Sequence, residues 1–80
     1  MDNRLKSILG TVFDLPADEI DDETSPGNVG LWDSLNHLRI ITEIEKAFQI
    51  RVSQKEIREM VTFGKIREVV GRHLSLKTVE

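Results

Sequence analysis

The sequence predicts an all-α fold: a small bundle of three principal helices plus one short helix, with a long loop between the first two principal helices. Apolar residues recur at helical spacing in three stretches, and residues typical of helix caps precede the expected helix starts. Residues 14–33 instead combine prolines, glycines and acidic residues, which indicates a loop. We expect residues 1–80 to form a single domain.

The first segment is expected to be a helix, because its apolar residues fall at i, i+3, i+4, i+7 and i+8, the spacing of one buried face. These residues are Leu5, Ile8, Leu9, Val12 and Phe13. Asp2 or Asn3 is expected to cap its start, since either side chain can accept a hydrogen bond from a helix amide.

The stretch 14–33 is expected to be a loop with one short helical turn, because Pro16, Asp18 and Glu19 all suit the start of a helix. Long connections in small domains tend to be either functional or disordered. We expect an ordered, functional loop, since five apolar side chains can pin it onto the helices: Leu15, Ile20, Val29, Leu31 and Trp32.

The second helix is expected to begin at Asp33 or Ser34 and to run to about Phe48. At 100° per residue Leu35 falls off the apolar side of this helix, so we expect it to be exposed. The apolar side itself is predicted to contain Leu38, Ile41, Ile44, Ala47 and Phe48.

Two further helices are expected after an extended linker, in which Ile50 and Val52 turn inward. Ser53 and Glu56 match a capping box, which should open a short helix through Met60. Thr62 can cap the last helix. The apolar residues of that helix recur at helical spacing: Phe63, Ile66, Val69, Val70 and Leu74.

The composition excludes several function classes. The chain has no cysteine and two histidines, so we expect neither a metal site nor a thiol nucleophile, and no pairing of nucleophile and base indicates an enzyme. No apolar run approaches the roughly 20 residues that cross a bilayer, so we expect no membrane insertion and a cytoplasmic location. Residues 1–33 carry a net charge of −6 and residues 34–80 one of +3. Without a continuous basic stripe, nucleic-acid binding is not expected.

Taken alone, Asp33-Ser34-Leu35 indicates only a helix cap. Its surroundings change this interpretation, because nearly the whole chain resembles the acyl carrier protein family. The stretches that resemble the family occur in its order and spacing: Leu15–Ile20, Leu31–Leu35, Ile44–Ile50 and Thr62–Ile66.

In such proteins the serine of the Asp-Ser-Leu motif receives 4′-phosphopantetheine from coenzyme A. The resemblance therefore implies that Ser34 is the modified residue and that Asp33 helps to position the metal and coenzyme A during attachment. It also implies a separate, magnesium-dependent phosphopantetheinyl transferase, and acyl-loading and acyl-transferring enzymes as partners. The thiol of the arm would then supply the group that the chain itself lacks, for acyl chemistry of the kind found in fatty acid biosynthesis and other lipid metabolism.

The exposed side of the second helix is expected to contact partner enzymes, through Leu35 and the polar residues Asn36, Arg39, Glu43 and Lys46. Asn36 and Arg39 stand where the family pattern commonly has acids. Because charge complementarity selects partners, we expect a specialised, monomeric carrier in a lipid or cell-surface pathway with its own enzymes. Two alternatives stay open: an aminoacyl or peptidyl carrier, and an unmodified helical adaptor.

Three side chains near the motif or on the last helix have structural interpretations. His37 is expected to pack against the loop, since no partner that could orient it as a base is visible. Trp32 is expected to anchor the loop in the core. His73 is expected to be structural or exposed. The long loop and the third helix are expected to be the most mobile parts, because they have the least apolar periodicity.

Overall fold

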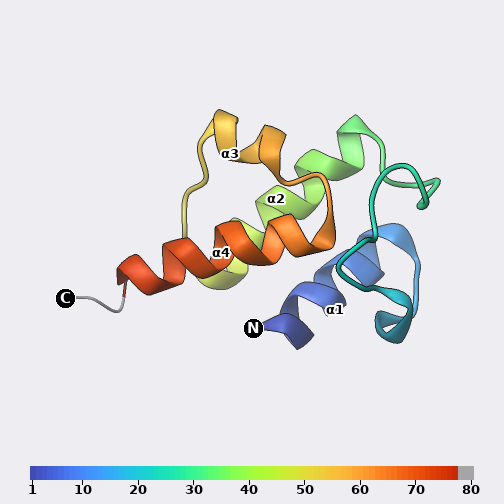
Figure 1. The fold of residues 1–80 in the computed structure, drawn as a ribbon, viewed down its shortest axis with the longest axis horizontal. Helices are drawn as coiled ribbons and strands as arrows, with labels where there is room; N and C mark the ends of the chain where they lie inside the picture. The colour runs from blue at the N-terminus through green and yellow to red at the C-terminus, as the bar shows by residue number, and fades with distance from the viewer. Residues whose placement is uncertain (78–80) are drawn as a thin grey trace.

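The computed structural model describes residues 1–77, and it confirms the all-α prediction. Helix α1 spans Asp2–Phe13, a 3₁₀ turn η1 spans Ala17–Glu19, and α2 spans Ser34–Phe48. The short α3 spans Gln54–Glu59 and α4 spans Phe63–Lys77. In Figure 1, α4 crosses in front of α2, and the loop after α1 runs along one end of the bundle. None of the described helices is long and apolar enough to cross a membrane.

The core forms where the apolar faces of α1, α2 and α4 meet. Apolar burial of this kind is the main favourable contribution to folding. The large fully buried side chains come from every principal helix, from the loop and from the segment before α4: Leu5, Leu9, Phe13, Ile20, Ile40, Ile44, Met60, Phe63, Ile66, Val69 and Val70. The linker residues Ile50 and Val52 also turn inward, as predicted, and no strand forms within residues 1–77.

Helix α1 starts without a side-chain cap and ends at a residue with left-handed backbone geometry. The predicted cap is wrong, because Met1 is the N-cap residue, Asp2 lies inside the helix and no side chain caps the first turn. The end of α1 is set by Asp14, whose φ of 56° is left-handed. Gly10 permits the chain to fold back there, since a Cβ at Gly10 would lie 2.6 Å from the carbonyl oxygen of Leu15.

The prediction of which residues form the apolar side of α2 is partly wrong. Leu38 is 53% exposed, whereas Ile40 is fully buried. The buried stripe is centred on Ile40, Ile41 and Ile44, because α2 packs against α1 and shares one core cluster with the buried residues of α4. Periodicity alone does not reveal which flank a neighbouring helix will cover.

The loop docks onto the N-terminus of α4. The amide of Phe63 donates to the Thr24 carbonyl at 2.9 Å, and the amide of Gly64 donates to the Asp22 carbonyl at 3.1 Å. The predicted cap Thr62 accepts from the amide of Lys65 at 3.1 Å. Loop and cap together therefore satisfy amides that every helix N-terminus leaves free.

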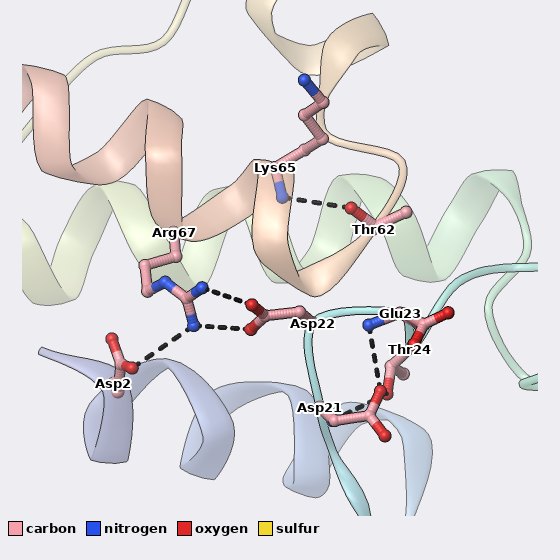
Figure 2. A network of polar contacts seen from close by, with 8 residues as sticks. All are labelled: Asp2, Asp21, Asp22, Glu23, Thr24, Thr62, Lys65 and Arg67. Atoms are coloured by element: carbon pink, nitrogen blue, oxygen red, sulfur yellow. Dashed lines mark hydrogen bonds and ion pairs between the residues drawn. The ribbon is translucent and has the colours of Figure 1, made fainter.

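An ion-pair network reinforces this docking (Figure 2). The two guanidinium nitrogens of Arg67 on α4 lie 2.7 Å from the two carboxylate oxygens of Asp22, a bidentate geometry. The same guanidinium lies 3.4 Å from Asp2 on α1. Arg67 thus links α4, the loop and α1.

Candidate functional site

Ser34 is the first residue of α2, and its side chain is exposed. Asp33 has the extended backbone of an N-cap residue, and its carboxylate accepts a hydrogen bond from the amide of Asn36 at 2.8 Å. The helix therefore begins where the sequence predicted. Ser34 presents a free hydroxyl at the positive end of the helix dipole, a position that favours a phosphate group.

The loop holds the start of α2 in place through Trp32 and Leu31. Trp32 is 4% exposed and stacks on Phe13 with ring centroids 5.0 Å apart, which confirms its predicted anchoring role. Leu31 is 50% exposed, so the prediction that it pins the loop is wrong. Its carbonyl instead accepts a hydrogen bond from the side chain of Asn36 at 2.7 Å. This backbone contact leaves the apolar side chain of Leu31 in solvent.

His37 lies one turn after Asp33 and joins three segments. Its Nδ1 accepts a hydrogen bond from the indole Nε1 of Trp32 at 2.9 Å, which confirms packing against the loop. Its Nε2 lies 2.9 Å from the carbonyl oxygen of Ile57 on α3. Because an indole N–H only donates and a carbonyl only accepts, the two partners assign a neutral ring with its proton on Nε2.

A hollow of about 640 Å³ opens beside Ser34, between α2, α3 and the loop. Its walls are mainly apolar: Trp32, Leu38, Ile57 and Val61 surround it, together with His37. Leu38 and Val61 are 53% and 49% exposed, so a large apolar surface lies next to the Ser34 hydroxyl.

The other predicted partner residues lie along the outer face of α2. Leu35 is 69% exposed, as its helical phase predicted. Glu43 pairs with Lys46 at 3.7 Å, and the guanidinium of Arg39 donates to the side-chain oxygen of Asn36 at 3.2 Å. A second hollow of about 550 Å³ lies between this face and α1. It is lined on the α2 side by Leu35, Leu38, Arg39, Thr42 and Glu43.

The site therefore has two hollows that meet at Leu38, with Ser34 at the edge of one and Leu35 at the edge of the other. The helix start is formed by Asp33, Ser34 and Leu35. The second hollow is lined by Arg39 and Glu43, and Lys46 lies one turn beyond Glu43. Sequence reasoning missed two contributions, the bond from His37 to α3 and the exposure of Leu38. The first had a signal, because His37 is in helical phase with Ile41 and Ile44.

His73 is structural, one of its two expected roles. Its Nε2 lies 2.9 Å from a carboxylate oxygen of Glu56, which ties α4 to α3. Glu56 also completes the predicted capping box with Ser53. The hydrogen bond from the Ser53 amide, followed by that from His73, lowers the pKa of Glu56. No cluster of potential metal ligands occurs in residues 1–77.

Comparison with known proteins gives consistent matches. A family model described as "Phosphopantetheine attachment site" matches residues 3–72. The non-reducing polyketide synthase Preu3 of Preussia isomera is 30% identical over 71 residues, 89% of this chain and 3% of that protein. The non-reducing polyketide synthase dbaI of Emericella nidulans is 33% identical over 72 residues, 90% of this chain and 3% of that protein. The chain thus spans about 3% of the length of these curated relatives.

A solved structure gives the same indication. The holo acyl carrier protein from Geobacter metallireducens, determined by solution NMR, superposes with a TM-score of 0.85 at 28% sequence identity. The match covers 95% of this chain and 87% of that one.

Proposed function

The chain belongs to the phosphopantetheine-attachment family of acyl carrier domains, and from this premise we propose that its covalent 4′-phosphopantetheine arm is attached to Ser34. A domain of this family is a carrier and not a catalyst. The observation that best supports the assignment is the exposed hydroxyl of Ser34, which stands at the N-terminus of α2 and beside the hollow.

The surroundings of Ser34 fit a phosphodiester-linked arm. The carboxylate of Asp33 is occupied by the Asn36 amide and remains exposed, so it caps the helix while facing solvent. The amides of the first helical turn favour the negative phosphate once it is attached. When bound, the arm supplies a thiol that holds acyl groups as thioesters.

The direct test is the intact mass after co-expression with a phosphopantetheinyl transferase. We expect a gain of about 340 Da, the mass of the arm, in the wild-type chain and none in Ser34→Ala. Ser7→Ala serves as the matched control, because Ser7 is also an exposed helical serine. A gain that persists in Ser34→Ala would reject the assignment, and no gain in any variant would favour the unmodified adaptor.

We further propose that this carrier serves a specialised acyl pathway with dedicated partner enzymes. The curated relatives are polyketide synthases, so the similarity gives no specific support to fatty acid biosynthesis. The outer face of α2 supports the proposal through its charges. Glu43 is already paired with Lys46, whereas the guanidinium of Arg39 hydrogen-bonds to the neutral amide of Asn36 and forms no ion pair within residues 1–77. An acidic partner surface would therefore be attracted to Arg39.

Arg39→Glu tests this partner preference. We expect the holo protein to be a poor substrate for the general elongation enzymes of fatty acid synthesis. We expect Arg39→Glu to be a better substrate, because it restores an acid where the family pattern commonly has one. Arg51→Glu makes the same charge change at an exposed position outside α2. Efficient elongation of the wild type together with no effect of Arg39→Glu would contradict the proposal. An amino acid found on the arm in the native host would favour the aminoacyl or peptidyl carrier.

A further inference from the structure

A polar side chain occupies the first position of the buried stripe of α2. His37, Ile41 and Ile44 follow one another at i, i+4 and i+7, and Ile40 lies on the same side. The three isoleucines are buried, and His37 is half-buried at the end of the stripe nearest Ser34. His37 thus stands where the hollow beside Ser34 meets the core.

Both ring nitrogens of His37 are engaged across this boundary. The bond from Nε2 to the Ile57 carbonyl joins α2 to α3, and the bond from Trp32 to Nδ1 joins α2 to the loop, each at 2.9 Å. The ring also lies nearly parallel to the indole of Trp32, with centroids 6.1 Å apart. Trp32 is in turn held against Phe13 of α1. The base of the hollow is therefore closed by a hydrogen-bonded contact between segments, and the isoleucines of the stripe below it are buried.

We propose that His37 is a specificity-determining residue of this carrier, which closes the α2–α3 boundary and confines an attached acyl group to the outer hollow. A short acyl group would then be sheltered by Leu38, Ile57 and Val61. A long chain would have to break both bonds of His37. That would leave the indole N–H of Trp32 without a partner and the Ile57 carbonyl with only the 3.3 Å contact of the Met60 amide. Long chains therefore stay outside the bundle. This inference rests on attachment of the arm to Ser34.

The test uses the full chain with acyl groups of defined length. Acetyl, hexanoyl and dodecanoyl arms are attached from the corresponding coenzyme A thioesters by a transferase that accepts them, and intact mass verifies each product. His37→Ala removes both bonds. His37→Leu removes them while keeping an apolar side chain in the stripe, in case the alanine variant does not fold. His73→Ala is the matched control, because His73 also bonds α3 but lies on α4.

Two readouts report where the acyl group lies: the thermal midpoint of each acyl form, and the NMR shifts of Ile41 and Met60 in the core. For the wild type and His73→Ala, we expect the dodecanoyl form to melt no higher than the hexanoyl form, with unchanged core shifts. For His37→Ala or His37→Leu, we expect the dodecanoyl form to melt about 4 °C or more above the hexanoyl form, with altered core shifts, since more apolar surface is buried.

The results separate this inference from the proposed function. A wild-type dodecanoyl form with altered core shifts, or histidine variants that behave like the wild type, would overturn the role of His37 while leaving attachment intact. A mass gain that is absent, or that persists in Ser34→Ala, would instead reject the proposed function and this inference with it.

Discussion

Asp33 has two proposed roles that substitutions can separate. Its carboxylate caps α2 through the Asn36 amide, and family resemblance implies that it also positions the metal and coenzyme A during attachment. Asn is as good an N-cap as Asp but has no charge. We expect the free energy of unfolding of Asp33→Asn to lie within about 0.5 kcal/mol of the wild-type value. We also expect this variant to accept the arm at least tenfold more slowly than the wild type.

Asp33→Ala completes this comparison, because it removes the cap together with the charge. We expect it to lose about 1 kcal/mol of unfolding free energy, measured in urea, and to be modified as slowly as Asp33→Asn. If Asp33→Asn is modified at the wild-type rate, the carboxylate acts only as a cap.

Trp32 contributes to stability through its indole N–H as well as its ring. Trp32→Phe keeps an aromatic ring against Phe13 but removes the donor to His37. We expect a loss of about 1–2 kcal/mol in urea unfolding, the range for a half-buried hydrogen bond whose acceptor is left unpaired. The double variant with His37→Ala isolates the pair, and a coupling below about 0.3 kcal/mol would show that the bond adds little.

At the scale of elements, the contact between Arg67 and the loop makes stability depend on pH. The hydrogen bond from Arg67, aided by its charge, holds the pKa of Asp22 below the ordinary value of 3.8. The unfolded chain therefore takes up this proton first as the pH falls. The stabilisation is complete above the ordinary carboxyl pKa and is lost as the pH falls through the lower folded value. Glu56, whose pKa is also lowered, acts in the same direction.

Arg67→Gln tests this link between α4 and the loop. We expect a lower thermal midpoint than the wild type at pH 7, and a difference that shrinks as the pH is lowered from 5 to 3. Arg72→Gln is the control, because Arg72 forms only an exposed 3.8 Å contact with Glu59. A difference that stays constant with pH would mean that Arg67 stabilises through packing on Phe63 and not through Asp22.

The elements that sequence predicted well are those determined by neighbouring residues. The capping box of Ser53, the cap of Thr62 and the turn after Pro16 depend on a few adjacent side chains, so they could be predicted from sequence. The start of α2 at Ser34 was predicted for the same reason, from the capping residue Asp33, and helical phase predicted the exposure of Leu35. The exposure of Leu38 depends instead on which flank α1 covers.

Contacts between distant segments could not be predicted in this way. The bond from His37 to Ile57 joins residues twenty positions apart, and the docking of Asp22 and Thr24 on the start of α4 spans about forty. The helical phase of His37 indicates only that its side chain faces inward, and no local pattern identifies Ile57 as its partner. The docking of the loop on α4 leaves no local pattern of spacing or caps. The apolar residues of the loop predicted that it is ordered. They did not predict that it docks on the N-terminus of α4.

At the scale of the whole molecule, stability is expected to be lowest in α3. This helix has six residues and none is fully buried, whereas α1 and α2 each have several. It is held by hydrogen bonds, from His37 to Ile57 and from His73 to Glu56, and by the packing of the partly buried Ile57 against the core. We expect its amides to exchange with solvent at least tenfold faster than those of Ile41 and Ile44.

Native-state hydrogen exchange followed by NMR measures this difference directly. His73→Ala should accelerate exchange in α3 further and leave α2 nearly unchanged, because the lost contact joins only α3 and α4. Equal protection of α3 and α2 would contradict the expectation, and it would indicate that the bundle opens only as a unit.

The position of Trp32 gives this protein a built-in optical reporter. It is the only tryptophan in the chain, it lines the hollow beside Ser34, and its indole bonds directly to His37. Intrinsic fluorescence therefore arises from a single known place, and arrival of an acyl group in the hollow should change its intensity and wavelength. Loading and unloading of the carrier could thus be followed in real time, without any attached dye.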